Sequence, residues 1–202
     1  MKTTILTIAI LIATVFGISQ SASAAIGSKE EVSTILTDMT SINKIEVHGN
    51  VELHLSVGTA DRVKVYNHYY AESALVQGEN GVLRISSYGA QKLVVWVTAS
   101  DLRELEVYDN AEIKSFGKLS TIDLDVKLYD RASAQLEMDT YAAKVTLNDH
   151  AKAAISGNAD EADLTYNRCS FFNTAGLVAF HMVKSVKLNR VYSSNYVKLA
   201  AL

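Results

Sequence analysis

The chain has 202 residues, with 19 Lys and Arg against 22 Asp and Glu, one cysteine and no proline. Both signs of charge are mixed along its length and no basic tract occurs, so the composition excludes a typical nucleic-acid-binding protein. A single cysteine excludes an internal disulfide, and we expect Cys169 to be a small buried apolar residue.

The first 24 residues have the parts of a cleavable secretory signal peptide in the usual order. Lys2 gives a positive start, residues 5–18 form an apolar core, and residues 22–24 offer a small-residue cleavage site before Ala25. The apolar core is shorter than the roughly 20 residues that a helix needs to cross a bilayer. We therefore predict an exported protein without a transmembrane anchor, located in the periplasm, on the outer cell surface or outside the cell.

Residues 25–41 form an N-terminal cap segment whose pattern fits a helix and a strand equally. Ser28 and Glu31 have the spacing of a capping box, and apolar residues follow at helical intervals. Several residues between 28 and 39 are β-branched, which favours a strand. The sequence leaves both alternatives open.

Residues 42–104 are dominated by apolar and polar residues in alternation, the period of a half-buried strand. Gly, Asn or Asp residues bound each alternating segment and predict tight turns. Residues 93–97 are continuously apolar, which predicts a strand covered on both faces. The alternating segments are residues 44–47, 51–55, 62–65 and 82–85.

An internal repeat occupies residues 105–194. Its template reads apolar, polar, apolar, then Tyr or Asn, then a charged residue, then mostly small residues, and residues 45–53 resemble an earlier copy. The five copies start 21, 19, 19 and 22 residues apart. They are residues 105–113, 126–134, 145–153, 164–172 and 186–194.

Units of about 20 residues bury a continuous apolar face only by stacking on copies of themselves. The sequence therefore predicts an all-β, single-domain β-solenoid, right-handed and parallel β-helix-like, with a more irregular N-terminal half at residues 42–104. An antiparallel β-sandwich is the alternative. In the solenoid, the first template position forms an inward ladder of Leu105, Val126, Val145, Leu164 and Val186.

The fourth template position predicts a structural ladder of Asn148, Asn167 and Asn189. Stacked amides at this position could satisfy the backbone groups of the turns.

The fifth template position stacks Asp109, Asp130 and Asp149. Three carboxylates about 5 Å apart are a weak candidate for Ca²⁺, which binds six to eight oxygens. The alternative is a solvated turn edge in which arginines offset the aspartates. We expect no cofactor.

No catalytic constellation is recognisable, and the five histidines lack metal-ligand spacing. The aromatic run at residues 66–70 suggests a sugar-stacking platform, with a strand followed by a packed loop as the plainer alternative. As partner-binding candidates the sequence offers Tyr69, Tyr70, Arg168 and Arg190.

Residues 42–53, the Gly58 turn, residues 80–85, and the step from residues 95–98 to 102–105 resemble a bacterial family of cell-envelope proteins. This family is the auto-transporter adhesin head GIN domain family, and the resemblance covers about residues 42–195. It implies a β-helix-like fold and an adhesive role, and it brings no catalytic residues. Where the family has small polar or glycine turns, this chain has Tyr-Asp-Asn, Tyr-Asp-Arg and Asn-Asp-His.

Two classes of function follow for residues 42–202. The first is a non-enzymatic adhesin or binding module for a surface glycan or an envelope protein, or a structural partner of such a protein. The second is a polysaccharide-cleaving β-helix enzyme that uses clustered aspartates. The first is favoured, because no second carboxylate cluster faces the aspartate column.

Overall fold

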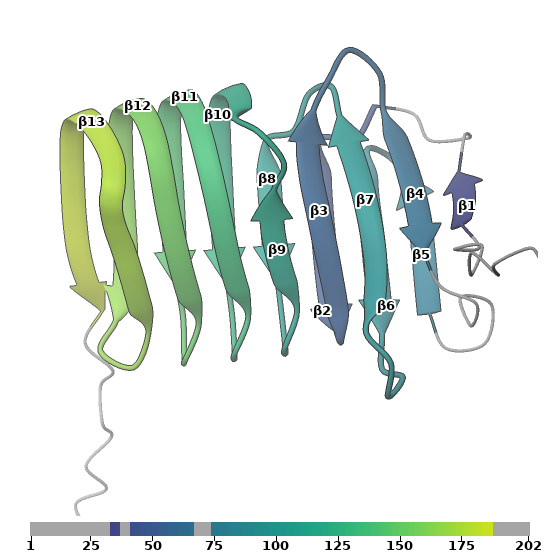
Figure 1. Ribbon diagram of the computed structural model, residues 1–202. Coiled ribbons are helices and arrows are strands. Elements are labelled where there is room, and N and C mark those ends of the chain that lie inside the picture. The colour runs from purple at the N-terminus through teal and green to yellow at the C-terminus, as the bar shows by residue number, and fades with distance from the viewer. Residues whose placement is uncertain (1–32, 37–40, 67–73, 188–202) are drawn as a thin grey trace, which may run out of the picture. The chain divides into compact units, whose positions relative to one another are not determined.

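The computed structural model describes residues 33–36, 41–66 and 74–187 (Figure 1). These residues belong to one compact unit that spans residues 31–202, and all of their regular structure is β-strand. None of them lies in a helix that could cross a bilayer. The predicted signal peptide lies outside the described residues.

Thirteen strands form one sheet. The first nine are short and the last four are long, and β1 shows that residues 33–36 of the ambiguous cap segment are extended. The short strands are β1 (Ser33–Leu36), β2 (Lys44–Gly49), β3 (Val51–Val57), β4 (Arg62–Tyr66), β5 (Ala74–Glu79), β6 (Val82–Ser87), β7 (Leu93–Ala99), β8 (Glu104–Val107) and β9 (Glu112–Ser115). The long strands are β10 (Leu119–Leu128), β11 (Ser133–Leu147), β12 (Lys152–Asn167) and β13 (Phe171–Lys187).

Parallel pairing dominates the sheet. Strands β10, β11 and β12 pair in parallel at an offset of 19 residues, and β8 pairs with β10 at an offset of 21. The first residues of β11 pair with β9 while the rest pair with β10, so the sheet curls as the chain advances (Figure 1). Antiparallel pairs join only β1 to β4, β4 to β7 and β5 to β6 among the described strands. An antiparallel sandwich is therefore not supported.

The core consists of rows of apolar side chains that run across the strands. Alternation places every second residue inside, and the absence of proline leaves each backbone N–H free for the ladder. Each fully buried side chain contributes about 1.5–3 kcal/mol. One row, wholly buried, consists of Leu83, Ile45, Leu105, Val126, Val145 and Leu164.

The predicted ladder agrees with the strand register at four positions and is wrong at the fifth. Leu164 pairs with Lys184, whereas Val186 pairs with Tyr166. The pairing of β12 with β13 also contains an irregularity between Ala154 and Ser156. A shift of two residues keeps the same side chains on the same face, so alternation alone cannot detect it.

Two burial predictions are also wrong. The apolar run at residues 93–97 is covered on one face only, and Trp96 on its other face is 36% exposed. Cys169 is exposed because it lies in the turn between β12 and β13. Neither orientation can be read from hydrophobicity alone, since a run without alternation does not identify its outer face.

Candidate functional site

The aspartate column lies on stacked turns at one end of the long strands. Asp109, Asp130 and Asp149 have φ of 61°, 56° and 53°, and Gly49 has the same position on an earlier strand, with φ of 83°. Each turn is closed by a backbone bond across it, such as Ala111 N–H to the Tyr108 carbonyl at 3.2 Å. Aspartate tolerates this left-handed conformation better than most residues do.

Each carboxylate of the column accepts a hydrogen bond from the backbone of the neighbouring turn. Asp109 Oδ2 accepts the N–H of Gly49 at 2.9 Å, and Asp130 Oδ2 accepts the N–H of Asp109 at 3.2 Å. Asp149 Oδ2 accepts the N–H of Asp130 at 3.3 Å. The carboxylates therefore tie successive turns together. Within the described ranges, no group of three or more His, Cys, Asp or Glu side chains could hold a metal ion.

Aromatic rings stack beside this column. The rings of His48 and Tyr108 lie 4.3 Å apart, and those of Tyr108 and Tyr129 lie 4.6 Å apart, with an interplanar angle of 2° in both pairs. The parallel pairing of β2, β8 and β10 brings these residues to one level on successive strands. The stack thus belongs to the same repeated turn as the aspartates.

Two of the predicted ladder asparagines lie in the described residues, and they act separately. Asn148 Nδ2 donates to the carbonyl of Leu128 at 3.4 Å, on the neighbouring strand. Asn167 is buried, and its Oδ1 accepts the N–H groups of Cys169 and Ser170 at 2.9 and 2.8 Å. Both amides satisfy turn backbone, while Asn189 lies outside the described residues.

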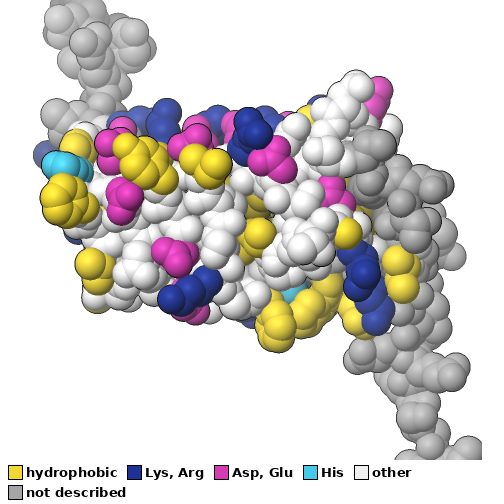
Figure 2. All heavy atoms as spheres, turned by 90° about the horizontal axis from the view of Figure 1, so that it is seen from above, with side chains coloured by type: hydrophobic (Ala, Val, Ile, Leu, Met, Phe, Trp, Pro, Cys, Tyr) yellow, Lys and Arg dark blue, Asp and Glu magenta, His cyan; other side chains and the backbone are white. Residues whose placement is uncertain are grey.

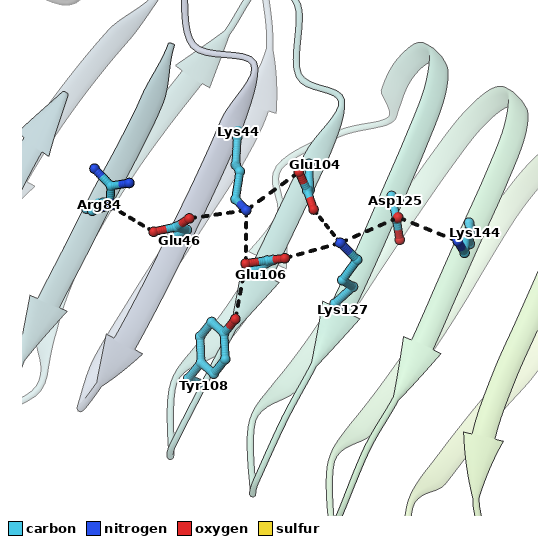
Figure 3. A network of polar contacts seen from close by, with 9 residues as sticks. All are labelled: Lys44, Glu46, Arg84, Glu104, Glu106, Tyr108, Asp125, Lys127 and Lys144. Atoms are coloured by element: carbon cyan, nitrogen blue, oxygen red, sulfur yellow. Dashed lines mark hydrogen bonds and ion pairs between the residues drawn. The ribbon is translucent and has the colours of Figure 1, made fainter. Parts of the chain in front are cut away.

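One outer face of the sheet carries a network of alternating charges (Figure 3). Lys44 Nζ lies 3.1 Å from Glu46 and 3.0 Å from Glu106, and Lys127 contacts Glu104 and Glu106. Cations and carboxylates come from β2, β6, β8, β10 and β11, because their outward positions lie side by side in the parallel register. The network also includes Arg84, Asp125 and Lys144.

The charges in this network stabilise one another. Burial opposes ionisation of Glu106, but hydrogen bonds from Lys44, Lys127 and Tyr108 lower the pKa of its carboxyl group to about 2. Burial and the hydrogen bond to Glu106 raise the pKa of Tyr108 to about 12. A general acid near neutral pH needs a raised carboxyl pKa, so Glu106 has the opposite tuning.

A different outer face carries an exposed aromatic cluster, formed by Trp96, His54 and Phe116. The Trp96 and His54 rings stack at 4.4 Å, and Phe116 meets Trp96 edge to face at 5.4 Å. Phe116 is 66% exposed. Lys64 pairs with Trp96 and Lys114 with His54 in the strand register, so a lysine flanks the cluster on each side.

The structure places the predicted partner-binding residues unequally. Arg168 is exposed in the turn before β13, whereas Tyr69, Tyr70 and Arg190 lie outside the described residues. The sequence reasoning missed the aromatic cluster. Trp96 is the only tryptophan in the chain, and its place in a continuous apolar run suggested a covered position rather than an exposed one.

Similar solved structures share this fold. A putative adhesin from Parabacteroides distasonis ATCC 8503 matches with a TM-score of 0.60 at 15% identity, over 77% of each chain. A putative adhesin from Parabacteroides merdae ATCC 43184 matches with a TM-score of 0.55 at 14% identity, again over 77% of each chain. A putative lipid binding protein from Parabacteroides distasonis ATCC 8503 matches with a TM-score of 0.60 at 9% identity, over 77% of this chain and 78% of the other.

No match to the chain was found among curated proteins. A family model described as "Putative auto-transporter adhesin, head GIN domain" matches residues 41–194, which include nearly all of the described strands. The resemblance seen in the sequence is therefore confirmed: the chain belongs to the head GIN domain family of auto-transporter adhesins.

Proposed function

We propose that this protein is an exported, non-enzymatic adhesin whose parallel stack binds a glycan of the cell surface or matrix. Residues 1–24 are removed on export in this proposal, residues 25–41 cap the stack, and residues 42–202 form a right-handed β-solenoid that presents flat binding faces. The family is named for adhesion, and two of the similar solved structures are named as adhesins.

The exposed aromatic cluster is the observation that carries the proposal. An indole ring beside a phenyl ring gives a large apolar surface at little cost in conformational entropy, and sugar rings stack on such surfaces. Lys64 and Lys114 can donate hydrogen bonds to hydroxyl groups or pair with acidic sugars. Lys114 Nζ already lies 2.8 Å from Glu52, which holds the side chain beside the cluster.

The remaining candidate residues extend this surface. Tyr69 and Tyr70 follow β4 closely in sequence, and β4 pairs with β7, which carries Trp96. We propose them as further stacking residues, with Arg168 and Arg190 as charged contacts at the opposite end of the stack.

A glycan array tests the proposal. We expect Trp96→Ala and Phe116→Ala to weaken binding at least tenfold, because each removes a stacking surface. The matched control is Tyr141→Ala, which removes an exposed aromatic ring from β11. A reducing-sugar release assay runs beside the array. Sustained, chelator-sensitive release of product would replace the adhesin proposal with a polysaccharide-cleaving enzyme.

A further inference from the structure

The last strand of the stack has a free edge. β13 (Phe171–Lys187) pairs with β12 on one side, and no described strand pairs with its other side. The two other ends of the sheet are β1 and β5, which have four and six residues, whereas β13 has 17. A long edge strand presents a row of unpaired N–H and C=O groups that can accept another strand.

The side chains of this edge strand are unusually apolar for an exposed segment. Val178 is 68% exposed and Phe180 is 83% exposed, and Phe171, Met182, Val183 and Val186 are exposed as well. Figure 2 shows hydrophobic side chains gathered at the end of the molecule where β13 lies. Exposed apolar groups that coincide with an unpaired backbone edge favour binding of an extended peptide.

The charge at this end is one-sided. No Asp or Glu occurs after Asp163, while β13 and the turn before it carry Arg168, Lys184 and Lys187. Lys184 Nζ donates to Thr174 Oγ1 at 3.0 Å and Lys187 Nζ to Asn148 Oδ1 at 3.5 Å. Both of these partners are neutral, so the positive charges remain uncompensated.

We propose that the free edge of β13 binds an extended segment of a partner protein in which apolar and acidic residues alternate. Such a segment adds a strand to the sheet, satisfies the backbone groups of the edge, and pairs its carboxylates with Arg168 and Lys187. A second copy of this chain would bring like charges together, and a lipid surface offers no backbone partners. This inference adds a second binding surface and does not depend on glycan binding.

Fluorescence anisotropy with a labelled peptide of alternating glutamate and valine tests the proposal on the full chain. We expect binding that weakens with added salt, and at least tenfold weaker binding to the double variant Arg168→Glu/Lys187→Glu. Lys118→Glu is the matched control, since it makes the same charge change on an exposed lysine between β9 and β10. The control should bind as the wild type does, and circular dichroism should show that both variants keep their strands.

Two control peptides separate strand addition from simple charge attraction. A lysine-for-glutamate peptide should not bind, and N-methylation of alternate residues along one edge of the acidic peptide should abolish its binding. Equal binding of either control peptide would overturn the proposal. So would peptide binding that occurs only after removal of residues 188–202, because the chain's own C-terminal segment would then be the occupant. A concentration-dependent dimer lost in the double variant would assign the edge to a second copy.

Discussion

Single residues in the stacked turns combine two tasks that are usually separate. Asp109, Asp130 and Asp149 supply a left-handed turn conformation, and their side chains also accept the N–H of the neighbouring turn. Glycine would provide only the first property and alanine neither. The column is therefore a structural feature of the turns in its own right.

Asp130→Ala should destabilise the protein by about 1–2 kcal/mol, because alanine at φ of 56° is strained and leaves the N–H of Asp109 without its carboxylate. Asp130→Asn is the control, because asparagine tolerates the same φ and keeps a side-chain oxygen. It should stay within about 0.5 kcal/mol. Urea unfolding measures both. Identical midpoints for wild type and Asp130→Ala would show that the column does not stabilise the fold.

Glu106 makes stability depend on acid. Its pKa is about 2 in the folded protein against 4.5 as the model value, so its contribution is present above pH 4.5 and is lost as the pH falls toward 2. Glu106→Gln should cost about 1–3 kcal/mol at pH 7 by removing charged hydrogen bonds. The difference between wild type and variant should shrink from pH 4.5 downward in denaturant melts. A difference that stays constant to pH 2 would contradict the proposed ionic role.

At the scale of the element, register is governed by small residues as well as by apolar rows. Ala111, Ala132 and Ala151 are fully buried at the same position of successive turns, where a larger side chain would meet the neighbouring strand. The turn at Ala132 also receives the N–H of Lys152 on its carbonyl at 2.9 Å. Side-chain volume at this position therefore limits how closely the strands approach.

Ala132→Val should destabilise the protein by about 1–3 kcal/mol through overpacking. Ala175→Val adds the same two methyl groups at an exposed position of β13 and should change stability by less than about 0.5 kcal/mol. Thermal unfolding of the two variants compares them directly. Equal effects would mean that the interior at Ala132 has room to spare.

The sequence predicted the elements better than it predicted their outer faces. Strand alternation and the 19-residue spacing gave the pairing of Leu105, Val126, Val145 and Leu164, because parallel strands repeat their register. The position of β13 could not be predicted, since a shift of two residues preserves alternation. The aromatic cluster at Trp96 was missed because it depends on which face the curled sheet leaves open, a tertiary property.

For the whole molecule, export is the first property to test. The positive start, the apolar core and the small residues before Ala25 predict cleavage after residue 24. Mass spectrometry of the periplasmic and secreted fractions should show a chain that begins at Ala25. Recovery of mostly uncleaved chain from the membrane fraction would contradict the prediction, and protease treatment of intact cells then distinguishes surface from periplasm.

The parallel offset of 19 residues also sets how the molecule responds to force. Tension applied along the stack acts on the hydrogen bonds between neighbouring strands a few at a time, so strands peel away in sequence from the β13 end. Each 19-residue step releases roughly 65 Å of extended chain. A tethered molecule built in this way lengthens in regular increments under load, and its remaining strands keep their folded faces while the end strand yields.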